Sequence, residues 1–397
     1  MRKVPKLRFK EFTDEWEEKK LGEIGVINPK SKTLPENFIY IDLESVIGGQ
    51  LKEKKIIEKK EAPSRAKRVV EKNDILYQTV RPYQQNNLYF SFNDELDYVA
   101  STGYAQIRIF YNNSGYVYYL IHTKKFLDKV LERCTGTSYP AINSEDLARI
   151  SIKISKNISE QEKIANFLSS VDKKISLTEE KLELFKEYKK GVMQKIFSQE
   201  LRFKDNEGND YPEWEEKRLG EILIKNKEKN KNNQYTLVQS ISNKYGFVNQ
   251  EEYFEDRKIA SNNLSNYYVV KNKNFAYNPS RINVGSLAYK KDFSISVISP
   301  LYVSFYADNI YVNDIFLLNW FFSLPFCKQM SSSFEGSVRN NLSYDTLSNF
   351  NILLPTLEEQ EKIANFLSSI DTKIEKIEKE LENLKEFKKG LLQQIFV

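Results

Sequence analysis

The sequence is poor in the residues from which many catalytic and metal sites are built. It holds a single histidine, His122, so it can assemble neither a histidine-based catalytic triad nor a histidine-rich metal site. Its two cysteines, Cys134 and Cys327, lie far apart and outside any C-x-x-C pattern, which argues against a disulfide framework or a zinc cluster. No run of 18 apolar residues occurs, and the basic segment Met1–Lys10 lacks the apolar stretch of a signal peptide. We therefore expect no membrane span and a cytoplasmic location.

Motifs for nucleotide and cofactor chemistry are missing as well. The sequence has no G-x-x-x-x-G-K-[ST] phosphate loop and no glycine-rich cofactor loop after a strand. The segment Asn278–Arg281 is similar to the Asn-Pro-Pro-aromatic element of amino-methyltransferases, but it lacks the second proline and the aromatic residue. Carboxylates and lysines with nuclease-like spacing are present, but such pairs arise by chance where 29% of residues are charged. We expect a chain with no catalytic residues, no metal and no cofactor of its own.

Length and charge leave several classes open. The 397 residues are enough for two or three domains, each with its own core. The formal charge of +5, from 60 basic and 55 acidic residues, permits nucleic-acid binding without requiring it.

An internal repeat is the strongest feature of the sequence. The segment QEKIANFLSSVDKKI, which begins at Gln161, returns at Gln360 with thirteen of fifteen residues identical, an offset of 199. Upstream, WEEKKLGEI at Trp16 returns as WEEKRLGEI at Trp214, and the tetrapeptide LRFK precedes both. Three matches in the same order indicate a duplicated module.

The middles of the two copies have diverged. Residues 30–130 and 230–330 share only scattered landmarks, such as Arg81 opposite Arg281. Matched ends preserve a common geometry, whereas variable middles indicate two versions of one task. The alternative is a duplication with a relaxed core, which does not explain why only the ends stayed matched.

Both middles are predicted to be mixed α/β structures with short strands. Residues 105–110 and 294–298 alternate with the period of a strand. Residues 116–131 and 315–330 are predicted as helices that follow the strands.

Each copy ends in a long predicted helix, the first from about Asn157 to Phe197. Asn157 with Glu160, and Thr356 with Glu359, have the spacing of capping boxes. Apolar residues then alternate by four and three over about five heptads, the narrow seam of a coiled coil. The principal seam residues are Ile164, Leu168, Val171, Ile175 and Leu182, and in the second copy Ile363, Leu367, Ile370, Ile374 and Leu381.

Polar residues interrupt this seam at three positions. Lys189 and Lys388 recur at equivalent places in the two copies, which suggests control of the register, whereas Thr178 interrupts only the first copy. Two such seams in one chain most simply pack on each other as a spacer between the modules. The alternative is that each helix packs only on its own domain.

Two loop regions in each middle carry side chains able to contact DNA. Arginine pairs with guanine acceptors and asparagine or glutamine with adenine, at ~1–3 kcal/mol of discrimination for each good bidentate pair. Small residues and donors in the second loop suit approach to phosphates. The candidates are Arg81, Gln84, Gln85, Asn86, Ser138 and Tyr139 in the first copy, and Ser280, Arg281, Asn283, Arg339 and Asn340 in the second.

The sequence resembles the specificity subunit of type I restriction-modification systems over essentially the whole chain. The resemblance rests on the duplicated segments at Gln161 and Gln360, the segments from tryptophan to Leu-Gly-Glu-Ile that precede the variable middles, and the landmarks at Arg81 and Arg281. This resemblance implies an α+β (mixed α/β) fold with a pseudo-twofold internal repeat. Two target-recognition domains, residues 1–156 and 199–355, would be joined by helices 157–198 and 356–397, which form an antiparallel coiled coil.

The resemblance also implies a function and partners. Each domain would contact one half of a bipartite, asymmetric site in double-stranded DNA, and the coiled coil would fix the spacer. Two modification subunits would dock on the chain, bind S-adenosylmethionine and methylate adenine, while restriction motor-nuclease subunits would use ATP and Mg. The alternatives are an adaptor whose modules bind protein partners without recognising a DNA sequence, and the recognition half of a fused nuclease-methylase.

Overall fold

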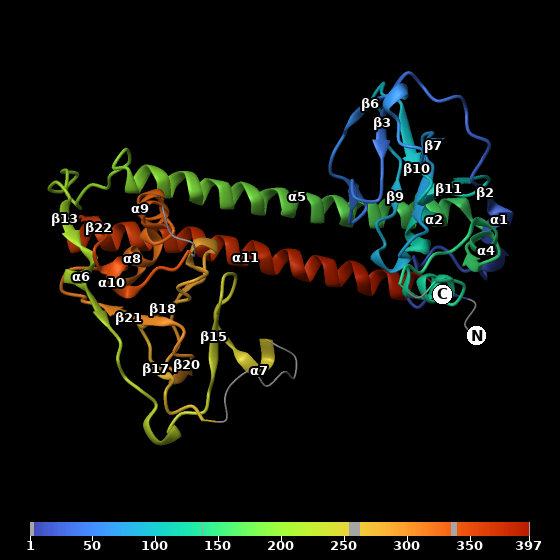
Figure 1. Ribbon diagram of the computed structural model, residues 1–397. Helices are drawn as coiled ribbons and strands as arrows, with labels where there is room; N and C mark the ends of the chain where they lie inside the picture. Colours follow the sequence, from blue (N-terminus) through green and yellow to red (C-terminus); the bar gives the residue numbers. More distant parts are fainter. Residues whose placement is uncertain (1–3, 137, 254–262, 335–339, 397) are drawn as a thin grey trace. The chain divides into compact units, whose positions relative to one another are not determined.

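The computed structural model describes residues 4–136, 138–253, 263–334 and 340–396. The chain divides into two compact units, Met1–Glu180 with Lys379–Val397, and Lys181–Glu378. The two long helices, α5 (Ile158–Phe197) and α11 (Leu357–Ile395), are continuous through this division (Figure 1). Each unit therefore combines one variable middle with a segment of both helices. Within the described residues, no helix is both long and apolar enough to cross a membrane.

The first unit is built around two four-stranded sheets, with strand orders β2-β11-β8-β9 and β6-β3-β10-β7. In the second sheet β10 runs parallel to β3, whereas the other pairs are antiparallel. The elements of this unit are β1 (Glu17–Lys20), α1 (Leu21–Ile24), β2 (Gly25–Ile27), β3 (Asn37–Ile41), β4 (Val46–Ile47), β5 (Gln50–Leu51), β6 (Ile56–Glu58), η1 (Lys59–Glu61), β7 (Ala66–Val69), β8 (Ile75–Gln78), η2 (Pro82–Gln84), β9 (Leu88–Tyr89), β10 (Tyr98–Ser101), β11 (Tyr104–Ile109), α2 (Ser114–Ile121), α3 (Lys124–Leu131), α4 (Ser144–Ala148) and β12 (Ser151–Ile154).

The second unit repeats the first of these sheets in the order β14-β21-β18-β19. In each unit a short pair, β1 with β12 or β13 with β22, joins the two ends of the module. The elements are β13 (Glu215–Arg218), α6 (Leu219–Ile222), β14 (Leu223–Lys225), η3 (Lys231–Asn233), β15 (Gln239–Ser242), β16 (Gly246–Asn249), α7 (Gln250–Tyr253), β17 (Tyr268–Val270), β18 (Phe275–Tyr277), η4 (Ile282–Val284), β19 (Leu287–Tyr289), β20 (Ser296–Ile298), β21 (Val303–Ala307), α8 (Asp314–Trp320), α9 (Leu324–Phe334), α10 (Tyr344–Ser348) and β22 (Asn351–Leu354).

The central strands are buried on both faces because their side chains alternate between two cores. In β8, Ile75 and Tyr77 pack into the core that contains the helices, whereas Leu76 packs into a separate core with residues of β3 and β10. In the same way, Phe275 and Tyr277 of β18 pack into the core that contains the helices, whereas Ala276 packs into a separate core. The repeat is therefore one of fold as well as of sequence.

The helix predicted over 116–131 is interrupted, and so is its counterpart over 315–330. In the first unit α2 ends at Ile121 and α3 begins at Lys124. The hydroxyl of Thr123 donates to the carbonyl of Leu120 and accepts from the amide of Phe126, so it closes one helix and caps the next. The prediction of one continuous helix was wrong because this capping is possible only at a break.

The capping boxes predicted at the starts of α5 and α11 form only in part. Asn157 Oδ1 accepts from the amides of Ser159 and Glu160, as an N-cap does. The Glu160 side chain does not bond back to the cap, because Ser155 Oγ already accepts the Asn157 amide. The carboxylate of Glu160 is instead fully buried.

This buried carboxylate joins the start of α5 to the beginning of the module. Glu160 accepts two hydrogen bonds from Arg8, at 2.7 and 2.9 Å, and one from the Trp16 indole at 3.3 Å. At the start of α11, Glu359 binds Arg202 and Trp214 in the same way. The matched LRFK and tryptophan segments of the sequence thus hold the two ends of each module together.

The long helices pack antiparallel within each unit. In the first unit Lys388 contacts Asp172 and Lys385 contacts Glu179; in the second, Lys189 contacts Asp371 and Lys186 contacts Glu378. As the residue number increases along one helix, the number of the contacting residue decreases along the other. The two helices therefore run antiparallel, which confirms the predicted pairing.

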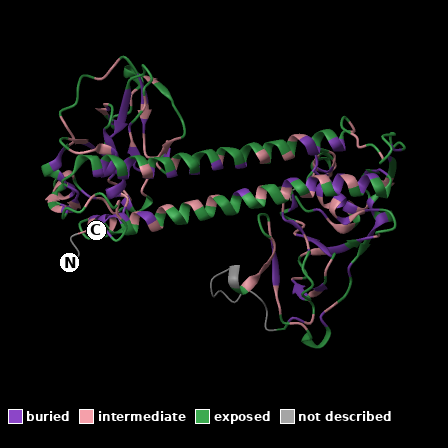
Figure 2. Cartoon of the chain, turned by 180° about the vertical axis from the view of Figure 1, so that it is seen from behind, coloured by how far each residue is buried: buried purple, intermediate pink, exposed green. Residues whose placement is uncertain are grey.

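The seam residues serve two purposes. In the first unit Ile164, Leu168, Val171 and Ile175 belong to the core of the module, which Leu391 and Ile395 of α11 also enter. Each helix therefore packs on its own module and on the other helix, so the two arrangements weighed for the seam coexist. Buried and exposed positions alternate along both helices (Figure 2). Leu182, Ile363, Leu367 and Ile370 are buried as well, and Ile374 and Leu381 are partly buried.

The last residues of each long helix pack into the core of the module from the other copy of the repeat. Phe396, which follows α11, packs against Trp16 and Tyr116 of the first unit, with ring centroids 6.2 and 5.3 Å apart. Phe197, at the end of α5, packs against Phe316 of the second unit at 5.4 Å. Neither module closes its core without the helix that ends on it.

Candidate functional site

The first candidate loop follows β8 and has an unusual backbone. Arg81 and Gln85, which flank the turn η2, both adopt left-handed conformations, with φ of 53° and 52°. Such values cost free energy in residues other than glycine and asparagine, and they persist where surrounding contacts impose them. Here the Arg81 amide donates to the carbonyl of Pro140 at 2.8 Å, which ties this loop to the second candidate loop.

Gln78, a buried glutamine at the end of β8, forms hydrogen bonds with several residues of the loop. Its Nε2 donates to the carbonyl of Val80 and to Gln84 Oε1, both at 2.8 Å, and its Oε1 accepts from the amide of Asn86. A buried side-chain amide with three partners is a rigid support. Gln78 therefore positions the Gln84 side chain and the backbone at Asn86.

A neighbouring network stiffens the base of the loop. Asn87 Oδ1 accepts from the amide of Gln78, so its amide nitrogen faces His122 Nε2 as a donor at 3.2 Å. His122 Nδ1 must then carry the proton and donate to the carbonyl of Tyr118 at 2.7 Å. Burial lowers the pKa of His122 to about 4, so the imidazole is neutral and structural at pH 7.

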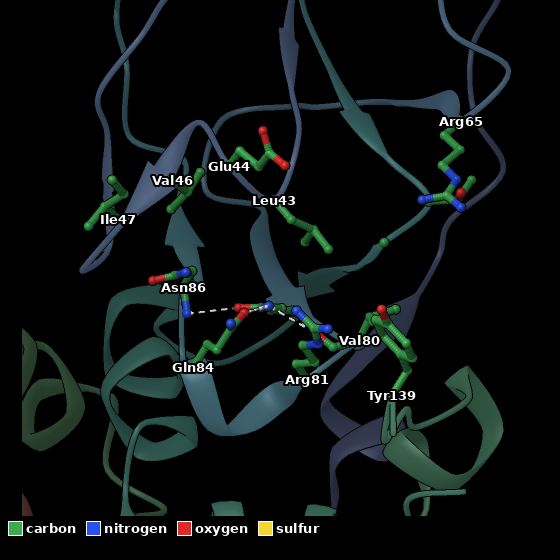
Figure 3. Close-up of a pocket in the computed structure, with 13 residues that line it drawn as sticks. Leu43, Glu44, Val46, Ile47, Arg65, Val80, Arg81, Gln84, Asn86 and Tyr139 are labelled. Atoms are coloured by element: carbon green, nitrogen blue, oxygen red, sulfur yellow. Dashed lines mark hydrogen bonds between the residues drawn. The ribbon is translucent and has the colours of Figure 1, made fainter. Parts of the chain in front are cut away.

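The loop borders a cavity of about 880 Å³. Arg81, Gln84, Asn86 and Tyr139 line it, so four of the predicted contact residues meet here (Figure 3). The Arg81 guanidinium stacks 4.3 Å from the centroid of the Tyr139 ring, and its Nε is buried without a hydrogen-bond partner among the described residues. A guanidinium held over the face of an aromatic ring is restricted in the directions in which its remaining donors point.

The sequence did not single out every residue of this cavity. Arg65, in the segment before β7, lies across the cavity from Arg81 (Figure 3), and Glu44 and Thr102 also line it. The basic run that contains Arg65, Lys67 and Arg68 was a signal for this arginine. Gln78 could not be identified because a buried polar residue in a strand does not reveal what it supports.

Two other candidates of the first unit lie apart from the cavity lining. Gln85 lines a second groove instead. Ser138 is exposed beside Tyr139 and is not among the lining residues.

The second unit brings the equivalent loops together with different local geometry. The amide of Leu342 donates to the carbonyl of Pro279, and Ser280 Oγ lies 3.4 Å from Asn341 Oδ1. Arg281 precedes the turn η4 as Arg81 precedes η2, but its φ is −134°, outside the left-handed region. Ser280, Arg281, Asn283 and Asn340 are exposed, and Arg339 lies outside the described residues.

Both modules therefore use one frame to present two different sets of side chains. Each set combines a guanidinium with amides or hydroxyls at a junction of two loops, the donor and acceptor chemistry suited to base edges and phosphates. Among the described residues, no group of three or more histidine, cysteine or carboxylate side chains is placed to hold a metal ion.

Comparison with known proteins gives a consistent result. The family model described as the type I restriction modification DNA specificity domain matches twice, over residues 13–186 and 211–386. The type I restriction enzyme MjaVIII specificity subunit from Methanocaldococcus jannaschii is 28% identical over 69% of this chain and 68% of its own length. The HindI specificity subunit from Haemophilus influenzae is 27% identical over 41% of this chain and 36% of its own length.

Solved structures share the fold at low sequence identity. The S subunit of a type I restriction-modification system from M. genitalium gives a TM-score of 0.60 at 15% identity, covering 99% of both chains. A chain from a study of assembly and conformational transition in a type I system gives 0.54 at 19% identity, over 96% of this chain and 97% of that one. Because the family model matches most of the sequence, in two copies, this chain belongs to the family of type I restriction-modification DNA specificity domains.

Proposed function

We propose that this chain is the DNA-specificity subunit of a type I restriction-modification complex. The observation that carries the proposal is the repeated junction of two loops on a repeated sheet, filled by different side chains in the two units. A shared frame with divergent contact residues suits two half-sites of different sequence. The target would then be bipartite and asymmetric.

We assign recognition of the DNA sequence to two domains, residues 1–156 and 199–355. We assign DNA contact to Arg81, Gln84, Asn86 and Tyr139 around the cavity of the first module, with Gln85 and Ser138 beside it. In the second module we assign it to Ser280, Arg281, Asn283, Arg339 and Asn340. The helices 157–198 and 356–397 would fix the spacer and dock the modification subunits.

Catalysis would then reside in partner subunits. Two modification subunits would bind S-adenosylmethionine and methylate adenine, and motor-nuclease subunits would use ATP and Mg. This chain would contribute sequence choice and assembly but no cofactor and no catalytic group. Since its proposed target is DNA, we expect it to act in the cytoplasm.

Methylome sequencing of the host with and without this gene tests the proposal directly. A bipartite methyladenine motif that disappears on deletion supports it and yields both half-sites and the spacer. An unchanged methylome, together with no salt-dependent affinity for duplex DNA in the presence of the modification subunits, would favour an adaptor that binds only proteins.

A further inference from the structure

A second groove, within the first unit, adjoins the turn η2. Its volume is about 470 Å³, and Gln84 lines both the groove and the cavity. Its lining combines the turn, through Gln84 and Gln85, with α3 and the last part of α11. The groove and the proposed reading site therefore meet at Gln84.

The groove is positively charged by its composition. Its lining includes Lys124, Lys385, Lys388 and Lys389 and no aspartate or glutamate. Three of these lysines share one side of α11, because positions 385, 388 and 389 lie three and four residues apart. His122 also lines the groove but adds no charge at neutral pH, since its imidazole is neutral.

The four lysines differ in how far their charges are already balanced. Lys388 and Lys385 contact Asp172 and Glu179 of α5, at 2.6 and 2.7 Å. Lys124 contacts Asp128 on its own helix, an exposed pair of small energetic value. Lys389 is exposed and engages in no ion pair within the described chain. Lys124 and Lys389 are thus the charges most open to an external anion, one on α3 and one on α11.

We propose that this groove binds the phosphate backbone of the DNA that the first module reads. The inference rests on the proposed function and adds to it a backbone-binding track, made by α3 and the end of α11, beside the base-reading cavity. Charge complementarity selects the occupant: a groove with four lysines and no carboxylate in its lining fits a polyanion. Because Gln84 borders both sites, we take this polyanion to be the DNA strand that occupies the cavity.

The second unit provides an internal comparison. By the repeat, Lys186, Lys189 and Lys190 stand where Lys385, Lys388 and Lys389 stand. The residues equivalent to His122 and Lys124 are different. Phe322 and Leu324 stand at these positions and are 49% and 48% exposed. At the positions equivalent to His122 and Lys124 the second unit thus carries apolar side chains and no cation, so we assign the phosphate groove to the first unit.

The test is the salt dependence of DNA binding by the full chain in complex with its modification subunits. Fluorescence anisotropy with a labelled duplex that carries the methylated motif, and with a scrambled duplex, gives the affinity across a KCl series. The variants are Lys124→Gln/Lys389→Gln and, as a matched control, Lys190→Gln.

We expect the double variant to lower the slope of log affinity against log [KCl] by about 1–2, since each phosphate contact contributes ~0.9 on duplex DNA. The loss should be similar on both duplexes, so the specificity ratio is kept, and Lys190→Gln should leave the slope unchanged. A wild-type slope in a double variant that still binds DNA overturns the groove while leaving the proposed function intact. Absence of DNA binding by the wild-type complex would instead overturn the proposed function.

A protein occupant predicts a different outcome. If the double variant loses modification subunits, measured by size-exclusion chromatography at fixed KCl, and keeps the wild-type slope, the groove is a protein-docking surface and the proposal is wrong. Both substituted lysines are exposed, and an unchanged melting temperature would show that the fold is kept.

Discussion

Lys189 Nζ lies 2.6 Å from Asp371 Oδ1, and the repeat reproduces this contact between Lys388 and Asp172 at the same distance. Each lysine occupies a seam position of one long helix and meets an aspartate of the other. A slip of one heptad between the helices would separate both pairs, so the contacts disfavour alternative registers. The recurrence of lysine at this seam position thus has a physical explanation.

A double-mutant cycle with Lys189→Gln and Asp371→Asn should give a coupling energy of ~0.5–1 kcal/mol in urea unfolding. The pair is only partly exposed, at 22% and 42%, which limits screening by solvent. The control cycle uses Lys186 and Glu378, a more exposed pair at 44% and 47%, and should give a smaller value. Equal coupling in the two cycles would argue against a special role for the seam lysine.

Substitution of Glu160 should be strongly destabilising. Glu160→Gln removes the charge that balances Arg8 in a buried site, and breaking such a pair costs ~3–5 kcal/mol. The midpoint of urea unfolding measures the loss. Glu11→Gln, which removes an exposed partner of Lys163 near the same helix, is the matched control and should leave the midpoint almost unchanged. Similar effects of the two substitutions would refute the anchoring role of Glu160.

The single histidine should make stability depend on pH. Its folded pKa of about 4 lies below the unfolded value of about 6.5, so the unfolded chain binds more protons between these values. The contribution is complete above pH 6.5 and is lost as pH falls toward 4, by about 3 kcal/mol at most. Unfolding free energies of the wild type and His122→Gln, measured from pH 7 to 4, should therefore converge in acid. Parallel curves would contradict this assignment.

Arg81→Ala tests whether the stacked guanidinium contacts a base. Loss of a bidentate base contact should lower affinity for the cognate duplex by about 5–150-fold, or ~1–3 kcal/mol, with little change on scrambled DNA. Competition binding measures both affinities. Arg281→Ala is the matched control, because its effect should map to the other half-site. A uniform loss on all duplexes would identify Arg81 as a phosphate contact instead.

Exchange of residues 25–150 for those of another family member should change one half-site only. The exchanged segment contains the reading loops, whereas Arg8, Trp16 and Glu160, which hold the ends of the module together, stay in place. Methylome sequencing of cells that carry the chimera reads out both halves. New sequence in both half-sites would be incompatible with independent modules.

Much of the fold was predictable because its signals are local. Heptad spacing and the Asn157 cap placed α5 closely, and the helix spans Ile158–Phe197. The repeat predicted two related units before any contact was known. The fate of Glu160 was not predictable, since a capping box is a local pattern and the competing partner, Arg8, lies 152 residues away.

The candidate site was predictable in composition but not in arrangement. Residue types suited to DNA identified Arg81, Gln84, Asn86 and Tyr139, which line one cavity. Gln85 belongs to the same loop segment and ends the turn η2 in a left-handed conformation, yet it lines a different groove. The lysines of α11 join that groove through packing between distant segments, and no sequence spacing reports such packing.

The packing of Phe396 on Trp16 and Tyr116 has a consequence for biosynthesis. A ribosome adds ~5–20 residues per second, so residues 181–396 take roughly 10–45 s to appear after the first module and its part of α5 have emerged. During that interval the aromatic side chains that Phe396 covers are exposed to water and to other chains. The first module must therefore wait for the second to be made, and a nascent chain stalled in between would be a natural substrate for chaperones.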